Sequence, residues 1–152
     1  MTWPAVASVL PQSPPMVLLD EIVAHDADST TCRVRIGFGV PFADDAGDVP
    51  SYVALEYMAQ TAAAHSGLVS RARGEPIRVG YLLGSRRIEL HVDHFRAGQE
   101  LSVVAVQVWS DGVLGSFACE VRDAAGGGAL VECVLNAMSP ADPESARAGD
   151  GA

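Results

Sequence analysis

The sequence contains no lysine, and acidic residues clearly outnumber basic ones. All ten basic residues are arginine, and the formal net charge is −9. A chain with this charge balance is repelled by the phosphates of nucleic acids and by anionic lipid surfaces. We therefore expect neither nucleic acid nor a membrane as a partner.

Cysteine is also scarce, and its placement excludes two common uses. Cys32, Cys119 and Cys133 lie in apolar segments, with no CxxC pair and no cluster of Cys and His. An odd number of such thiols favours reduced core cysteines in a cytoplasmic protein over a disulfide frame. His91 and His94 lie three residues apart but have no evident third ligand, so we expect no metal site and no cofactor.

Long apolar runs and targeting signals are missing as well. The N-terminus has no basic region followed by an apolar run, so no signal peptide is expected. An apolar content of 49% over 152 residues is enough for one domain with its own core. We expect a single domain over residues 1–138, located in the cytoplasm, and a disordered tail rich in Pro, Ala and Gly over 139–152.

The most prominent pattern that is present predicts a helix between Pro50 and Gly74. Proline suits a first helical turn, and glycine suits a left-handed helix end. The residues between them are apolar nearly all round, which predicts a helix buried on most sides. A carboxylate, Glu56, lies on this helix with Gln60 one turn later, whereas His65 is nine residues from Glu56 and so on the opposite side.

A carboxylate on a buried helix has two interpretations, and the sequence leaves both open. Glu56 is either a structural group satisfied by a partner, or an acid, base or substrate-orienting group inside an apolar pocket.

Strand patterns flank the predicted helix on both sides. Alternation of apolar and polar residues predicts strands at 16–25, 30–38, 77–92, 100–110, 113–123 and 129–138. Four prolines allow only a short helical turn before Leu10. Short connections favour an antiparallel sheet, and one helix is available to cover it. We predict an α+β fold in which an antiparallel sheet of five to seven strands wraps around one long helix.

The arginines are unevenly distributed along the chain. Six of the ten fall within residues 71–96, where they face three acids, so this window carries +3 and the rest of the chain −12. The window is either a solvated face or a docking patch for a phosphate or an acidic protein, because the guanidinium fork matches both.

Several segments, taken in order, resemble the 3-hydroxyacyl-[acyl-carrier-protein] dehydratases, which have the hotdog fold. The segment 56–60 (EYMAQ) resembles the ExMAQ motif of that family's central helix. Weaker matches are Leu10-Pro11, Pro15-Met16, Leu18-Leu19-Asp20, and Phe95, Gly98 and Leu101. The segment 80–86 (GYLLGSR) looks closer to a divergent branch associated with aryl polyene pigment synthesis. Together the matches span most of residues 10–138.

One departure from this family concerns its catalytic histidine. In the family that His lies fourteen residues before the helix Glu, and the corresponding position here is Phe42. No His lies between His25 and His65. The family builds each active site across a dimer interface, with His from one chain and Glu from the other. The resemblance therefore implies a catalytic Glu56, in a homodimer or in a heterodimer with a His-bearing hotdog paralogue.

The resemblance also implies a substrate. This is a 3-hydroxyacyl chain on the phosphopantetheine arm of an acyl carrier protein, dehydrated in fatty acid or aryl polyene synthesis. We expect Gln60, Tyr81, Gly84 and Arg86 to contact it. Two other functions stay open: a non-catalytic hotdog subunit that binds acyl thioesters, and a hotdog thioesterase that uses the helix carboxylate. Dehydration keeps the thioester and forms a double bond, whereas hydrolysis releases the free acid.

Overall fold

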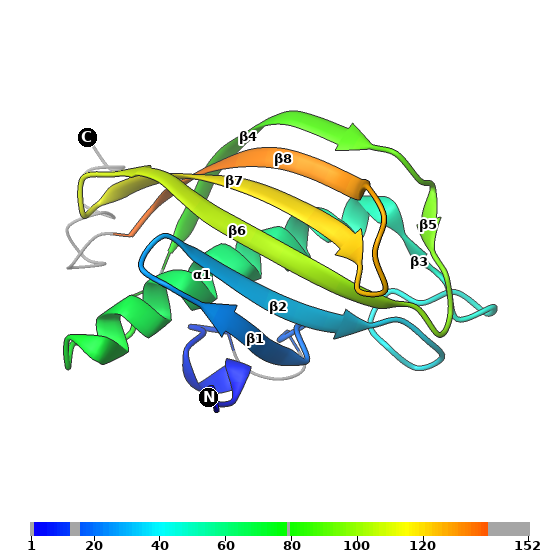
Figure 1. Ribbon diagram of the computed structural model, residues 1–152, viewed down its shortest axis with the longest axis horizontal. Helices are drawn as coiled ribbons and strands as arrows, with labels where there is room; N and C mark the ends of the chain where they lie inside the picture. The colour runs from blue at the N-terminus through cyan, green and yellow to red at the C-terminus, as the bar shows by residue number, and fades with distance from the viewer. Residues whose placement is uncertain (1, 13–15, 79, 140–152) are drawn as a thin grey trace, which may run out of the picture.

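A single long helix lies in the curve of a sheet in the computed structural model, which describes residues 2–12, 16–78 and 80–139 (Figure 1). This helix, α1 (Ala54–Ala72), follows a short 3-10 helix, η2 (Ser51–Val53). Gly74 has a φ of 69°, which confirms the expected left-handed helix end. Pro50 is extended and comes just before η2, so its predicted place inside the first helical turn is wrong by one residue.

Six strands form one antiparallel sheet in the order β1-β2-β6-β7-β8-β4. They are β1 (Glu21–His25), β2 (Ser29–Arg35), β4 (Tyr81–Leu90), β6 (Glu100–Ser110), β7 (Leu114–Asp123) and β8 (Ala129–Met138). A separate two-stranded sheet consists of β3 (Val49–Pro50) and β5 (His94–Phe95), and β3 leads directly into η2. The expected short turn before Leu10 is η1 (Val6–Ser8). The predicted α+β architecture, a sheet wrapped around one helix as in the hotdog fold, is confirmed.

The core lies between α1 and the inner face of the sheet. Alternate residues of the central strands are fully buried there, such as Val103 of β6 and Val121 of β7. Cys32, Cys119 and Cys133 are free and buried, as their apolar neighbours predicted. Burial raises the pKa of the Cys32 thiol to about 12, so this group is an inert part of the core.

The first strand is shorter than the sequence pattern indicates. Only residues 21–25 form the strand that pairs with β2. Asp20 still donates its N–H to the Arg33 carbonyl of β2, whereas residues 16–19 lie outside the sheet. Gln60 of α1 accepts a hydrogen bond from the Leu18 N–H at 2.9 Å and donates one to the Met16 carbonyl at 2.7 Å. The side chain of Gln60 thus forms the hydrogen bonds that the sequence pattern predicted for a neighbouring strand.

One side of α1 is not covered by any other part of the chain. The prediction that this helix is buried on most sides is therefore wrong for the single chain. Eleven of its 19 residues are buried. The uncovered side carries half-buried small and apolar residues, among them Ala59, Ala63 and Ser66, and the exposed Glu56. The expected burial of Glu56 is therefore wrong for one chain by itself.

The C-terminal tail expected over residues 139–152 is described only at its first residue. Ser139 donates its N–H to the Val113 carbonyl, and residues 140–152 of the expected tail lie outside the described residues.

Among the described residues, no helix has the length and apolar character needed to cross a bilayer.

Candidate active site

Glu56 lies in the first turn of α1, on its uncovered side. One carboxylate oxygen accepts a hydrogen bond from the Gln60 side chain at 3.0 Å. The carboxylate is therefore held in one orientation, while it remains accessible to a second molecule.

Gln60 is fully buried and holds Glu56 to the N-terminal segment. Its amide nitrogen donates to Glu56 Oε1 and to the Met16 carbonyl, and its amide oxygen accepts from the Leu18 N–H. An amide nitrogen has two protons to donate, and both are used. This arrangement leaves Gln60 no free donor for a substrate and makes it a positioning group for Glu56.

We expect Gln60→Leu to lower the free energy of unfolding by about 2–4 kcal/mol, because it leaves two main-chain groups at Met16 and Leu18 without partners. The measurement is urea denaturation of the variant and the parent protein. Glu56→Gln is the matched control, since a glutamine oxygen there still accepts the bond from Gln60. A stable Gln60→Leu variant would show that the N-terminal segment is held elsewhere.

A cavity of about 550 Å³ adjoins this carboxylate. Residues of α1 from Glu56 to Ser70, with Arg73 just after the helix, line one side. The β6–β7 hairpin with the adjoining ends of β4 and β8 lines the other. Its volume falls within the range of small-molecule binding sites. Glu56 thus lies at the edge of a space large enough for an acyl chain.

A buried polar network extends from this cavity to β1. The Thr30 hydroxyl lies 2.8 Å from Nδ1 of His65 and 2.7 Å from Nδ1 of His25. Thr30 and His65 are almost completely buried. His65 lines the cavity, and its Nε2 is buried without a hydrogen-bond partner among the described residues. His65 bonds to Thr30 and not to Glu56, in agreement with its expected place on the opposite side of the helix.

This network makes the protein sensitive to acid. Burial lowers the pKa of His65, and repulsion from His25 adds to it, although Asp26 and hydrogen bonds with the backbone of Ser29 and Ala27 oppose the shift. Burial also lowers the pKa of His25. Since the folded pKa values lie below the unfolded value of about 6.5, the unfolded chain takes up these protons first. Stability is therefore present above about pH 6.5 and lost as the pH falls below it.

We expect His65→Asn to flatten this loss of stability, because asparagine cannot take up the buried proton. The measurement is the urea midpoint of both proteins between about pH 7.5 and pH 5.5, the range in which histidine titrates. The same fall in midpoint for both proteins would contradict the assignment to His65.

The other expected substrate contacts lie in β4, away from Glu56. Gly84 is half-buried, Arg86 is exposed, and neither lines the cavity. Tyr81 begins β4, and its side chain lies outside what the structure describes. Gly80 and Leu82, from the same segment, do line the cavity. The start of β4 thus contributes to this space through positions that the sequence did not single out.

The six arginines of the window are spread over several places. Arg71 lies beside Ser8, and Arg96 pairs with Asp48 at 2.9 Å. Arg73 and Arg78 line the cavity, where Arg78 lies 3.6 Å from Glu75 and donates to the Gly112 carbonyl. Arg87 lies at a bulge of β4 with a φ of 53° and lines a separate hollow of the sheet. A single continuous docking patch over the window is therefore not formed by this chain alone.

Phe42, at the position that corresponds to the family histidine, lies in the loop between β2 and β3. Its φ is 70° and its side chain is 62% exposed. A positive φ is unusual for a bulky residue and marks a position whose backbone conformation is imposed by the surrounding loop. Bonds from Ala43 to Val40 and from Asp44 to Asp48 hold that loop. The position that the sequence resemblance matched to the family's histidine is thus an exposed aromatic side chain.

The edge strand β4 is long and carries aliphatic side chains exposed by about half. These are Leu82, Leu83, Ile88 and Leu90. A long apolar edge strand is an aggregation risk unless another strand covers it. The edge opposite to β1 is therefore suited to pairing with a second chain.

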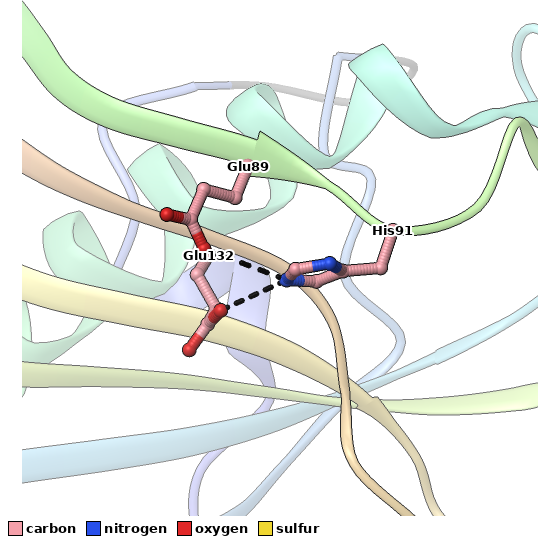
Figure 2. Close-up of side chains that lie close together, drawn as sticks. All are labelled: Glu89, His91 and Glu132. Atoms are coloured by element: carbon pink, nitrogen blue, oxygen red, sulfur yellow. Dashed lines mark hydrogen bonds and ion pairs between the residues drawn. The ribbon is translucent and has the colours of Figure 1, made fainter.

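Sequence reasoning also missed a cluster at the outer side of β4 and β8. His91 Nε2 lies 3.0 Å from a Glu132 oxygen and 3.6 Å from a Glu89 oxygen (Figure 2). The hydrogen bond from His91 lowers the pKa of Glu132. Although three such groups could hold a metal ion, the half-exposed ring and carboxylates already pair with one another, so we assign no ion to them.

Comparisons with known proteins agree with this geometry. The family model described as ApeP-like, ApeP dehydratase, matches residues 4–148. The solved dehydratase heterocomplex ApeI:P from Xenorhabdus doucetiae contains a chain that is 31% identical. The match covers 96% of this chain and 97% of that one, with a TM-score of 0.88. None of the curated proteins matches the sequence significantly.

More distant structures share the fold alone. A hypothetical thioesterase with coenzyme A from Streptococcus pneumoniae is 13% identical, with a TM-score of 0.59 over 79% of this chain and 84% of that one. Cj0977, a virulence protein from Campylobacter jejuni, is 15% identical, with a TM-score of 0.63 over 90% and 97%.

The fold is that of a hotdog protein, and the family match places the chain in the dehydratase class. Within that class, the chain belongs to the ApeP-like dehydratase family. The resemblance to 3-hydroxyacyl-carrier dehydratases of the aryl polyene branch is thereby confirmed.

Proposed function

We propose that this chain is the carboxylate-bearing subunit of a two-chain dehydratase that acts on 3-hydroxyacyl thioesters in aryl polyene synthesis. The observation that carries the proposal is Glu56, held by Gln60 at the edge of the cavity but open to solvent. The position that the resemblance reserves for a catalytic His is occupied by Phe42. A chain that supplies the carboxylate without the base needs the base from elsewhere.

The partner in this proposal is a hotdog subunit that carries the missing histidine. The related chain of known structure was solved in a heterocomplex named ApeI:P. The exposed aliphatic side chains of β4 support pairing at that edge, because a second sheet would cover them. The partner's His then faces Glu56 across the interface, at the uncovered side of α1.

In this mechanism the partner's His removes a proton from the carbon next to the thioester carbonyl. Glu56 lies on the other side of the substrate and protonates the leaving 3-hydroxyl group, which departs as water. The electron pair of the broken C–H bond becomes the new double bond, and the thioester stays intact. Each group must hold the correct protonation state before the step, which is the requirement for general acid–base catalysis.

The substrate arm in this proposal is phosphopantetheine on an acyl carrier protein. Arg73 and Arg78 lie at the end of the cavity away from Glu56, and Arg86 and Arg87 lie on β4. We propose that an acidic carrier protein contacts arginines of one of these two groups, since guanidinium groups pair well with phosphate and carboxylate.

Mass spectrometry of a 3-hydroxyacyl carrier thioester tests the proposed reaction. The substrate is incubated with this chain, with a His-bearing hotdog paralogue, and with both. We expect loss of one water from the bound acyl group in the mixture. Release of the free acid would instead support a thioesterase. A paralogue that dehydrates by itself and is only activated by this chain would support a non-catalytic subunit.

A further inference from the structure

Two large side chains with extensive apolar surface are exposed next to the carboxylate of Glu56. Tyr52 of η2 is 69% exposed, and Met16 is 59% exposed. Exposed apolar side chains are ordinary where they are scattered singly over a surface. Here both belong to the surroundings of one carboxylate, and the structure fixes their places beside it.

Hydrogen bonds place Met16 beside the carboxylate. The amide nitrogen of Gln60 donates to the Met16 carbonyl at 2.7 Å and to Glu56 Oε1 at 3.0 Å. The Met16 main chain and the carboxylate are therefore neighbours that share one donor. Gln60 itself is fully buried, whereas the Met16 side chain extends into solvent from this anchored point.

Helix geometry places Tyr52 beside the same carboxylate. Tyr52 precedes Glu56 by four residues, about one helical turn, so both side chains lie on the same side of the segment formed by η2 and α1. Val53 and Ala54, which lie between them in sequence, are buried. The uncovered side of the first turn of α1 thus presents a carboxylate with an aromatic ring and a thioether side chain next to it.

We propose that Tyr52 and Met16 anchor the His-bearing partner chain, which buries both side chains when it covers Glu56. The identity of the partner rests on the proposed function. A partner whose His faces Glu56 must cover the first turn of α1, and this is the surface that Tyr52 and Met16 flank. The surface is continuous with the uncovered side of α1, where the proposed interface lies. Large side chains buried at the centre of an interface contribute most of its binding energy, and tyrosine is enriched among them.

The same contact has a chemical consequence for Glu56. In the single chain the carboxylate is exposed to water. Packing of the Tyr52 ring and the Met16 side chain against the partner excludes water from the space beside it, which strengthens the electrostatic interactions of the carboxylate with the substrate. Neither side chain is covered in the single chain, so this shielding arises only on assembly.

The affinity between the two chains tests the proposal without any turnover. Calorimetry measures the binding of the purified partner to this chain and to its variants. We expect the dissociation constant to rise by at least about thirtyfold in Tyr52→Ala and by about tenfold in Met16→Ala, as for residues at the centre of an interface. Tyr52→Phe keeps the ring and should bind within about threefold of the parent protein.

Trp109→Ala is the matched control. Trp109 is a similarly exposed aromatic residue, at 53%, but it lies on β6, which β7 and β8 separate from the edge strand β4. We expect its affinity for the partner to stay within about threefold of that of the parent protein. All the replaced side chains are exposed, so the unfolding temperatures of the variants should match that of the parent protein and show that each variant is folded.

Absence of binding by the parent protein, unchanged affinity in Tyr52→Ala, or an equal loss in Trp109→Ala would overturn the proposal. Equal losses in Tyr52→Phe and Tyr52→Ala would assign the contact to the hydroxyl group and would also overturn it. So would self-association of this chain that Tyr52→Ala abolishes while the two-chain complex stays intact, because the surface would then bind a second copy.

The proposed function and the proposed interface can fail separately. A complex that Tyr52→Ala weakens but that dehydrates nothing would end the proposed function and leave the interface in place. A complex that dehydrates its substrate and keeps its affinity in Tyr52→Ala would end the proposal on Tyr52 and leave the function in place.

Discussion

Replacing Glu56 by glutamine is expected to lower dehydration by the two-chain complex by about 10²–10⁴-fold, the usual cost of losing a positioned acid or base. Glutamine keeps the size of the side chain and an oxygen that accepts the bond from Gln60, now at 3.0 Å from Glu56. The change therefore removes the ionisable group alone. The measurement is the initial rate of water loss from a 3-hydroxyacyl carrier thioester.

Assembly provides the control for this prediction. Glu56 is exposed in the single chain, so its replacement leaves the core unchanged. The complex should form with the same affinity, and its unfolding temperature should stay within about 2 °C, because exposed substitutions change stability little. A rate that survives Glu56→Gln, or that falls only as the complex dissociates, would assign this chain a structural role.

The second large effect concerns stability. Gly67 lies on α1 where the helix meets the segment after η1, and a Cβ atom there would come within 2.0 Å of the Val9 carbonyl oxygen. Both main chains would have to move apart. We expect Gly67→Ala to lower the free energy of unfolding by about 3 kcal/mol or more, at the upper end of overpacking effects. Chemical denaturation measures the loss.

Gly37→Ala is the matched control for Gly67→Ala. A Cβ atom at Gly37 meets nothing within 4 Å, and its φ is not in the left-handed region. We expect that variant to unfold within about 0.5 kcal/mol of the parent protein. Equal stability of the two variants would show that the N-terminal segment does not pack on α1 at this point.

The longer elements could be predicted because local chemistry and tertiary environment agree in them. The strands at 100–110 and 129–138 match the structure at both ends. A part of each alternates buried residues with more exposed ones, which is the local signal of a strand. Gly74 marks the end of the helical region because only glycine adopts its backbone conformation without strain.

Elements set by distant contacts could not be predicted. Residues 16–20 read as strand, but Gln60, more than forty positions later, bonds to main-chain groups of Met16 and Leu18. β3 and β5 have two residues each, too few for any periodic signal. The apolar side of α1 suggested complete burial because sequence does not distinguish a side covered by the same chain from one left open.

The candidate site shows the same division between local signals and distant contacts. Glu56 was found because it interrupts an apolar helix, which is a local signal. The contact of His65 with Thr30 and His25 joins three elements, and no spacing in the sequence brings them together. A polar residue on each of two apolar segments, Thr30 and His65, was the only available hint.

The most direct test of the account is a titration of the His-bearing partner into a fixed amount of this chain, with the rate of water loss as the readout. If Glu56 and the partner's His form one site, this chain alone turns over no substrate, and the rate rises to a plateau at one partner per chain. Full dehydration by this chain alone, or a rate that follows the partner without any break at equal amounts, would contradict it.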